Sequence, residues 1–222
     1  MTEKKRQLPI WQESILLVIT AMVMAVIVKT FFLQAFYIPS ASMEPTMLID
    51  DKLLVQKVSY WTGEAKRGDI VVFDDPGGWL GEEESNKANN PLQRALETVG
   101  LFPTGGHLIK RVIGVGGDQV VCCTEGGKLT INGKTLDEPY LLDQQGPASD
   151  LTFDVLVPKE HLWVMGDNRS NSADSRSHLG DPGGGFIAEK AVVGKAWLRV
   201  WPWNRAGIIR KPSSFDAVNE QN

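Results

Sequence analysis

An almost unbroken apolar run over residues 15–36 restricts the fold more than any other part of the 222-residue chain. A helix rises 1.5 Å per residue, so about 20 residues cross a hydrocarbon core of roughly 30 Å. The run has no polar face, which argues against a buried core helix, and it leads into bulky residues rather than a signal-cleavage site. We therefore predict a membrane-spanning helix over residues 15–37.

Positive charges near the N-terminus predict how this helix is oriented. Lys4, Lys5 and Arg6 precede the apolar run, and such residues favour the cytoplasmic side of a membrane. We therefore expect a single-pass protein of the cell membrane, with residues 1–14 in the cytoplasm and residues from 38 onward outside it.

Composition excludes several classes of function. A net charge of −4 and a pI of about 5.5 give no basic surface for nucleic acid. The two cysteines are adjacent, as Cys122-Cys123, which matches no zinc-ligand spacing. We expect no nucleic acid, no metal and no cofactor. The cysteine pair is interpreted either as two unpaired strand residues or as a vicinal disulfide.

Beyond residue 38, short runs of alternating polar and apolar residues are separated by turn residues, a pattern typical of strands. Asn132-Gly133 between two such runs is a strong hairpin signal. We predict a mostly β extracytoplasmic domain over residues 38–210, a loop over 147–154 and a flexible tail over 211–222. The expected strands are 52–58, 69–73, 107–115, 118–122, 128–131, 162–165 and 191–201.

Residues 77–105 interrupt this pattern and are predicted to be an insertion. A Gly-rich, acidic loop is followed by a helical stretch from Pro91 to Gly100, with apolar residues on one face. We expect this helix to cover the domain core, with a resting place on the membrane as the alternative.

Ser42 is a candidate nucleophile because of its two flanking prolines. Pro39 and Pro45 restrict their own φ angles and push the preceding residues, including Glu44, toward extended conformations. A second hydroxyl, Ser40, lies two positions earlier. The turn would present a reactive oxygen with little freedom; the alternative interpretation is a juxtamembrane linker.

Lys110 is the better candidate for a base, because none of the three histidines lies in a catalytic motif. On a strand over 107–115, Leu108, Lys110 and Val112 share one face, which places the amine among apolar side chains. Burial disfavours the ammonium, so the pKa of a lysine amine can fall into the range where it accepts a proton. A surface lysine is the alternative. Arg111, on the other face, is expected to make an ordinary charged contact.

Residues 166–176 form a polar stretch directly after an apolar strand. Its Gly, Asn and Asp residues suit an ordered loop against the core rather than a solvated one. Ser172 could then reach the Lys110 amine, and Asp174 and Arg176 could form a bidentate pair.

Four stretches resemble, in the same order, the conserved motifs of the type I signal peptidase (leader peptidase) family. The resemblance extends over about residues 15–200 and is specific because four motifs occur together. The matching stretches are 39–46, 67–73, 109–118 and 166–176.

This resemblance implies a signal-peptidase-like β domain of antiparallel sheets that acts as a serine endopeptidase. It implies removal of signal peptides from preproteins at Ala-x-Ala sites, in contact with membrane lipids and near the secretion translocase. Ser42 would be the nucleophile and Lys110 its general base. Ser40 would contribute to the oxyanion hole with the backbone N–H of Ser42.

The remaining motif positions imply supporting and substrate-binding roles. Ser172 would orient the amine, and Asp174 and Arg176 would support the loop. The chain departs from the family pattern after Arg176, where many members have an aromatic residue and then Gly, whereas residues 177–180 read Ser-His-Leu-Gly. Positions matching the pockets for small substrate residues are Ile38, Met43, Met47, Leu53, Leu108 and Ile109.

Two other functions share features with this sequence. Self-cleaving SOS repressors share a Ser-Lys pair on a related β fold, but the apolar run and the lack of a helix-turn-helix pattern argue against them. The other is a membrane-anchored, non-catalytic β domain that binds exported proteins. Loss of cleavage on removal of the Ser42 hydroxyl or the Lys110 amine would distinguish it from an enzyme.

Overall fold

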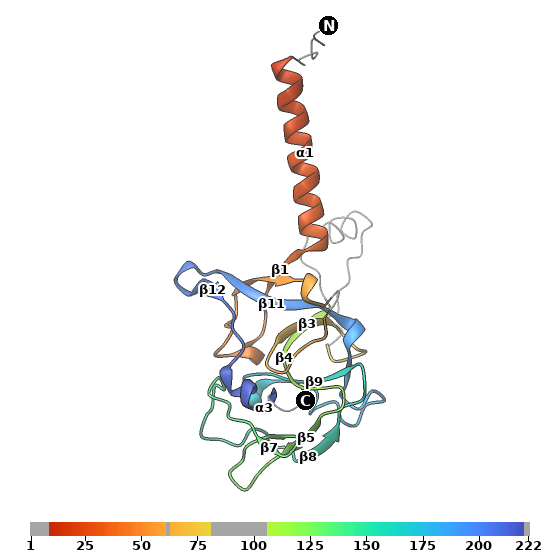
Figure 1. Ribbon diagram of the computed structural model, residues 1–222. Coiled ribbons are helices and arrows are strands. Elements are labelled where there is room, and N and C mark those ends of the chain that lie inside the picture. Colours follow the sequence, from red (N-terminus) through yellow and green to blue (C-terminus); the bar gives the residue numbers. More distant parts are fainter. Residues whose placement is uncertain (1–8, 61–62, 81–105, 220–222) are drawn as a thin grey trace.

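A long helix stands away from a β domain in the computed structural model, which describes residues 9–60, 63–80 and 106–219 (Figure 1). The helix, α1, runs from Ile10 to Phe31. Its segment Ile10–Val28 has a mean hydropathy of 2.0 and is 0 % buried. Length and composition thus suit a membrane span, as the sequence predicted. None of the described residues buries the side chains of this segment.

The helix ends earlier than the sequence predicted. Residues 33–37, expected to belong to the span, form strand β1 (Leu33–Tyr37), which pairs with β2 (Lys52–Gln56). Phe36 packs against a buried cluster of the β domain. The prediction of a span over 15–37 was wrong at this end. Residues 33–37 continue the mainly apolar run, but they pair with β2 and pack against the β domain.

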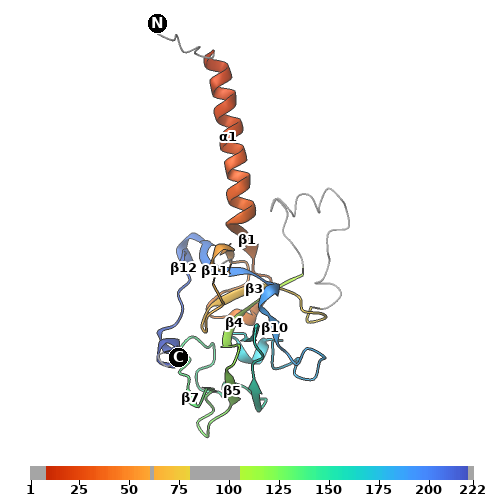
Figure 2. The same ribbon diagram turned by 45° about the vertical axis from the view of Figure 1, so that its right-hand side comes forward.

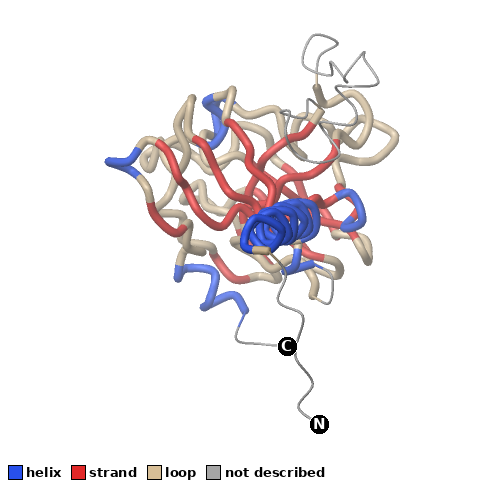
Figure 3. The backbone as a smooth tube through the Cα atoms, turned by 90° about the horizontal axis from the view of Figure 1, so that it is seen from above, coloured by secondary structure: helices blue, strands red, loops and turns tan. Residues whose placement is uncertain are grey.

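The larger sheet contains most of the strands and is antiparallel throughout. Its order is β1-β2-β11-β3-β4-β9-β10, and β12 pairs with β11. Figure 3 views it from above, with α1 seen nearly end-on over the strands. The further strands are β3 (Ile70–Asp74), β4 (His107–Val115), β9 (His161–Met165), β10 (Ile187–Ala188), β11 (Val192–Trp201) and β12 (Gly207–Ile208).

A smaller antiparallel sheet lies at the end of the domain away from α1 (Figure 2). The predicted hairpin at Asn132-Gly133 is confirmed, with φ angles of 52° and 79° that suit these two residue types. Its strands are β5 (Gln119–Cys122), β6 (Thr130–Ile131), β7 (Lys134–Thr135) and β8 (Phe153–Leu156). The mostly β prediction is therefore confirmed.

Strand β8 overlaps the segment predicted as a loop, residues 147–154. Phe153 and Val155 are buried whereas Asp154 and Leu156 are exposed, so the strand alternates with a period of two. At the end of the neighbouring β5, Cys122 and Cys123 are joined in a vicinal disulfide, one of the two interpretations left open by the sequence.

Residues 211–219 are docked, which corrects this part of the flexible tail predicted over 211–222. Phe215 is fully buried and Val218, in the short helix α3 (Asp216–Asn219), is 6 % exposed. Phe215 lies so close to Gly68, which has a φ of +86°, that a Cβ there would be 2.8 Å from its ring. These two apolar residues anchor the polar C-terminal segment, because both belong to the buried cluster that contains Trp163 and Met165.

Two predictions lie outside the described residues. They are the positive cluster at Lys4, Lys5 and Arg6 and the helix from Pro91 to Gly100 in the predicted insertion.

Candidate active site

Ser42 lies on a single 3₁₀ turn, Ala41–Met43, between the two prolines. Glu44 is extended, with φ −65° and ψ 145°, as expected for a residue before proline. The Ser42 residue is 6 % exposed. The turn therefore holds a buried hydroxyl on a restricted backbone.

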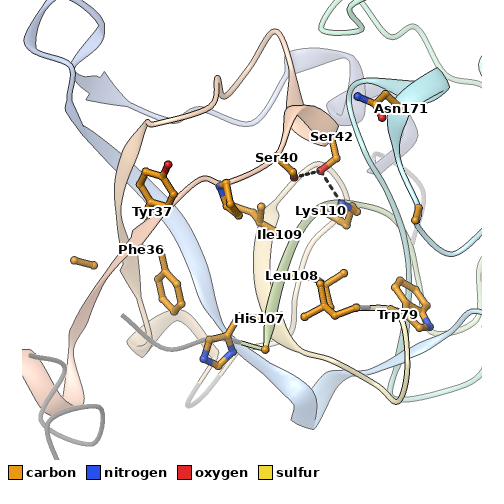
Figure 4. Close-up of a pocket in the computed structure, with 15 residues that line it drawn as sticks. Phe36, Tyr37, Ser40, Ser42, Trp79, His107, Leu108, Ile109, Lys110 and Asn171 are labelled. Carbon is orange, nitrogen blue, oxygen red and sulfur yellow. Dashed lines mark hydrogen bonds between the residues drawn. The ribbon is translucent and has the colours of Figure 1, made fainter. Parts of the chain in front are cut away.

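The Lys110 amine meets this hydroxyl. Lys110 Nζ lies 2.8 Å from Ser42 Oγ, and Ser40 Oγ lies 3.3 Å from Ser42 Oγ on the other side (Figure 4). Strand β4 places Lys110 on the same face as Leu108 and Val112, and all three residues are buried. A hydroxyl in contact with a buried amine is an arrangement in which the amine, once neutral, can accept the hydroxyl proton.

The loop after β9 holds the Ser42 turn in place through backbone contacts. The Asn168 N–H donates to the Ser42 carbonyl at 3.1 Å, and Asn168 Nδ2 donates to the Ala41 carbonyl at 3.1 Å. Gly166 approaches so closely that a Cβ there would be 2.4 Å from the Ser42 carbonyl oxygen and 2.3 Å from Ser172 Oγ. Only glycine fits this position without displacing the turn.

Asp174 and Arg176 form the bidentate pair that the sequence predicted. Arg176 Nε and Nη2 donate to the two oxygens of Asp174, each at 2.8 Å, and the Gly166 N–H donates to Asp174 at 2.9 Å. Burial alone would raise the pKa of Asp174, but the hydrogen bonds and charge of Arg176 outweigh it and the pKa is lowered. The pair therefore remains ionised and fixes the loop.

Ser172 lies at the centre of this loop, and its hydroxyl is buried. Within the part of the chain that the structure describes, Ser172 Oγ makes no hydrogen bond of regular geometry. It is nevertheless near enough to Asp174 to help lower the pKa of that carboxyl group.

A buried ion pair beside the site was missed by the sequence reasoning. Arg111 is 1 % exposed, and its Nε and Nη2 donate to Asp167 at 2.8 and 2.6 Å. Thr46 Oγ1 donates to the same carboxylate at 2.5 Å. The expectation of an ordinary charged contact for Arg111 was wrong, because the pair joins β4, the loop after β9 and the segment after Ser42. Arg111 follows Lys110 and Asp167 follows Gly166, so both residues stand in the motifs. The sequence does not show that they meet, because 56 residues separate them.

A second buried pair supports the same loop from the side of the smaller sheet. Arg169 pairs with Glu138 and also donates to the carbonyls of Gly166 and Ala148 at 2.9 and 2.8 Å. The Tyr140 ring lies 4.2 Å from the Arg111 guanidinium. The loop over 166–176 is thus held by charges buried on both sides.

A groove with a volume of 420 Å³ runs from Ser42 and Lys110 along β1 and β4. Of the six predicted pocket residues, Leu108 and Ile109 line it. The other four lie together in a packed cluster that Ile109 also contacts, with exposed fractions of 0–2 %. They are Ile38, Met43, Met47 and Leu53. Trp79, which the sequence reasoning did not single out, also lines the groove.

No group of three or more His, Cys, Asp or Glu residues suited to a metal ion occurs among residues 9–60, 63–80 and 106–219. Two of the histidines bond instead to other partners, His161 to the Lys159 carbonyl at 2.8 Å and His178 to Asp181 at 2.7 Å.

Comparison with known proteins shows the family to which the chain belongs. Residues 11–201 match the family model described as signal peptidase, peptidase S26, so the chain belongs to this family and is a peptidase. Its function is accordingly that of a signal peptidase I.

The relatives match over most of their length. A probable signal peptidase I of Mycobacterium leprae is 39 % identical, over 96 % of this chain and 84 % of that protein. Signal peptidase I of Mycobacterium tuberculosis is 38 % identical, over 90 % and 75 %. A crystal structure of a signal peptidase I from Enterococcus faecalis is 24 % identical, covers 60 % of this chain and 96 % of that one, and has a TM-score of 0.39.

Proposed function

We propose that the chain removes signal peptides from exported preproteins by a Ser-Lys mechanism, with Ser42 as nucleophile and Lys110 as general base. The observation that carries this proposal is the 2.8 Å contact between Lys110 Nζ and Ser42 Oγ at one end of an apolar groove. Both residues are buried, with exposed fractions of 4 % for Lys110 and 6 % for Ser42.

The reaction follows from this contact. The neutral Lys110 amine takes the proton of Ser42 as its Oγ attacks the scissile carbonyl, and it later gives that proton to the leaving amine. The Ser40 hydroxyl and the backbone N–H of Ser42 stabilise the oxyanion. The same amine then activates the water that releases the acyl enzyme.

The loop over 166–176 keeps the amine in position. Ser172, whose hydroxyl is buried beside Gly166, orients the Lys110 amine, the role that the family resemblance implies for this position. Asp174 and Arg176 hold the loop rigid through their bidentate pair. These are positioning roles, because neither charge contacts Ser42.

Small side chains before the cut are selected by shallow pockets, which gives preference for Ala-x-Ala sites. The packed cluster of Ile38, Met43, Met47 and Leu53 leaves these side chains almost no exposed surface. A cluster so tightly packed supports shallow pockets, because a large substrate side chain would have to displace buried residues.

The β domain works at the outer face of the cell membrane, with the N-terminal residues in the cytoplasm. α1 supports this topology by its apolar length, and Lys4, Lys5 and Arg6 support it by their charge. In Figures 1 and 2 the β11–β12 hairpin lies at the end of the domain from which α1 rises. Its exposed Trp203 and Ile208 contact lipid headgroups there, near the secretion translocase.

The proposal is tested by cleavage of a preprotein with an Ala-x-Ala site by the full chain in detergent. Ser42→Ala and Lys110→Met should each lower kcat by a factor of 1,000 or more while circular dichroism remains unchanged. Lys128→Met is the matched control, because that lysine is exposed and its ion-pair partner, Asp137, is exposed as well. Folded variants that still cut would exclude the mechanism, and binding without cleavage by wild type would favour the non-catalytic β domain.

The pH dependence tests the base separately. Since only the neutral amine accepts a proton, kcat/KM should fall about tenfold per pH unit on the acid side of the Lys110 pKa. A rate that is constant across the weakly acidic range would exclude Lys110 as general base.

A further inference from the structure

The groove has two different sides, separated by strand β4. Ile109 packs with the cluster that contains Ile38 and Met43, whereas Leu108 packs with a different cluster that Trp79 and Leu80 join. Figure 4 shows Trp79 on the side of Leu108 and Lys110, with Phe36 and Tyr37 on the opposite side. A substrate strand in this groove would therefore meet one set of residues on each face.

Trp79 is held in place by the turn that precedes it. The two oxygens of Asp75 accept hydrogen bonds from the backbone N–H groups of Gly77, Gly78 and Trp79, at 3.1, 3.2 and 3.0 Å. Gly77 and Gly78 both have positive φ, at +128° and +94°. The turn therefore needs these glycines, and it orients the indole before any substrate arrives.

The indole is also supported by aromatic contacts from two other segments. The His178 ring stacks on Trp79 with centroids 4.3 Å apart and an interplanar angle of 7°, and Phe73 meets it edge-on at 6.0 Å. His178 is in turn bonded to Asp181 at 2.7 Å. His178 lies two residues after Arg176, so the segment that follows the loop over 166–176 supplies the ring that stacks on Trp79.

We propose that Trp79, supported by His178, selects the side chain of the second residue before the cut. This inference rests on the proposed function, which places the scissile carbonyl at Ser42. Side chains of an extended peptide alternate between faces, so the first and third residues face the Ile109 side and the second faces Trp79. Leu108, which the resemblance placed with the pockets for small residues, packs instead in the cluster that Trp79 joins. It lies two residues from Lys110, about 7 Å along the strand, within reach of the second side chain.

A flat indole favours a side chain with a large apolar or aromatic surface. Aromatic pairs in stacked or edge-on contact are stabilised beyond the effect of their buried area. Such a contact should raise kcat/KM for an aromatic side chain about tenfold over that for Gly. The enzyme should therefore prefer Phe or Leu over Gly at the second position, while the first and third positions accept only small residues.

The test uses peptides with Ala at the first and third positions and Gly, Ala, Leu or Phe at the second. For wild type in detergent, kcat/KM should be about tenfold higher for Phe than for Gly. Trp79→Ala should reduce this ratio to below about threefold, and Trp79→Phe should keep most of it. Trp197→Ala is the control, because Trp197 is partly exposed on β11 and does not line the groove.

His178 gives a second, independent variant. His178→Ala should weaken the preference in the same direction as Trp79→Ala but less, and His178→Phe should restore it by renewed stacking. Selectivity for Ala over Leu at the first position should be unchanged in all variants.

The outcomes separate this inference from the proposed function. If Trp79→Ala and Trp79→Phe lower kcat/KM by one common factor for all four peptides, Trp79 is structural and the inference is wrong. If wild type cuts all four peptides equally well, the inference fails and the proposed function stands. If wild type cuts none of them and no preprotein either, both are overturned.

Discussion

The two regions that flank Ser42 and Lys110 are held in place by different forces. The loop over 166–176 is fixed by buried charges, including Arg111 with Asp167 and Arg176 with Asp174. We call Trp79 and the turn over residues 75–79 the Trp79 wall of the groove. It is held by hydrogen bonds to partly exposed Asp75 and by ring stacking on His178. Under the proposed mechanism, the chemistry would depend on rigid, buried ion pairs, whereas substrate preference would depend on contacts that can change without unfolding the domain.

Breaking the Arg111 pair should have the largest effect on stability. Asp167→Asn leaves a buried guanidinium without its counter-charge, which costs about 3–5 kcal/mol of unfolding free energy. Urea denaturation of the full chain in detergent measures it. Asp137→Asn is the matched control: its pair with Lys128 is exposed on both sides, so the loss should stay below about 1 kcal/mol. Equal losses in the two variants would mean that burial of the Arg111 pair is irrelevant.

Gly166→Ala should come next, because the added Cβ overlaps the Ser42 carbonyl and Ser172 Oγ. Overpacking of this kind costs about 1–3 kcal/mol in stability. Displacement of the Ser42 turn should lower kcat about 100-fold, since a 1 Å misplacement can have that effect. The control Gly183→Ala tests a glycine with nothing within 4 Å and no positive φ, and it should leave kcat unchanged. Full activity of Gly166→Ala would show that the loop does not determine the position of Ser42.

Acid should weaken the loop through Asp174. Its pKa is lowered in the folded state, so its contribution is fully present above the unfolded value of about 3.9 and is lost as the pH falls through the folded pKa. Asp174→Asn should lower stability at pH 7 by about 1.5–3 kcal/mol and remove part of the decline below pH 4. Denaturation midpoints between pH 7 and pH 2 measure both effects. An unchanged pH dependence would show that the pair contributes nothing.

The smallest effect on stability is expected for the Trp79 wall. Asp75→Ala removes three backbone hydrogen bonds from a partly exposed turn. Water can replace these bonds, so the unfolding free energy should change by only about 1 kcal/mol. The preference at the second substrate position should nevertheless weaken, since the indole is no longer oriented. Asp143→Ala, which affects a similar exposed turn at Gln145 and Gly146, is the control. A preference that survives in Asp75→Ala would mean that stacking on His178 alone holds Trp79.

Local sequence patterns predicted the elements whose interactions are mainly local. β4 begins and ends at the predicted residues, and the turn at Asn132-Gly133 requires only two residue types. The motif residues Ser42 and Lys110 were identified, and the structure brings them into contact. The end of α1 was misjudged because β1 is apolar for a different reason, its pairing with β2 and packing on the core.

The sequence by itself therefore determined the membrane-length helix, the β class of the domain and the residues that carry the proposed chemistry. Their patterns are short, and hydrophobicity and proline act on neighbouring residues. Only the tertiary structure decided the burial of Arg111 against Asp167, the docking of Phe215 and the stacking of His178 on Trp79. Such contacts join segments far apart in the chain, and their free energy depends on burial that no local pattern records.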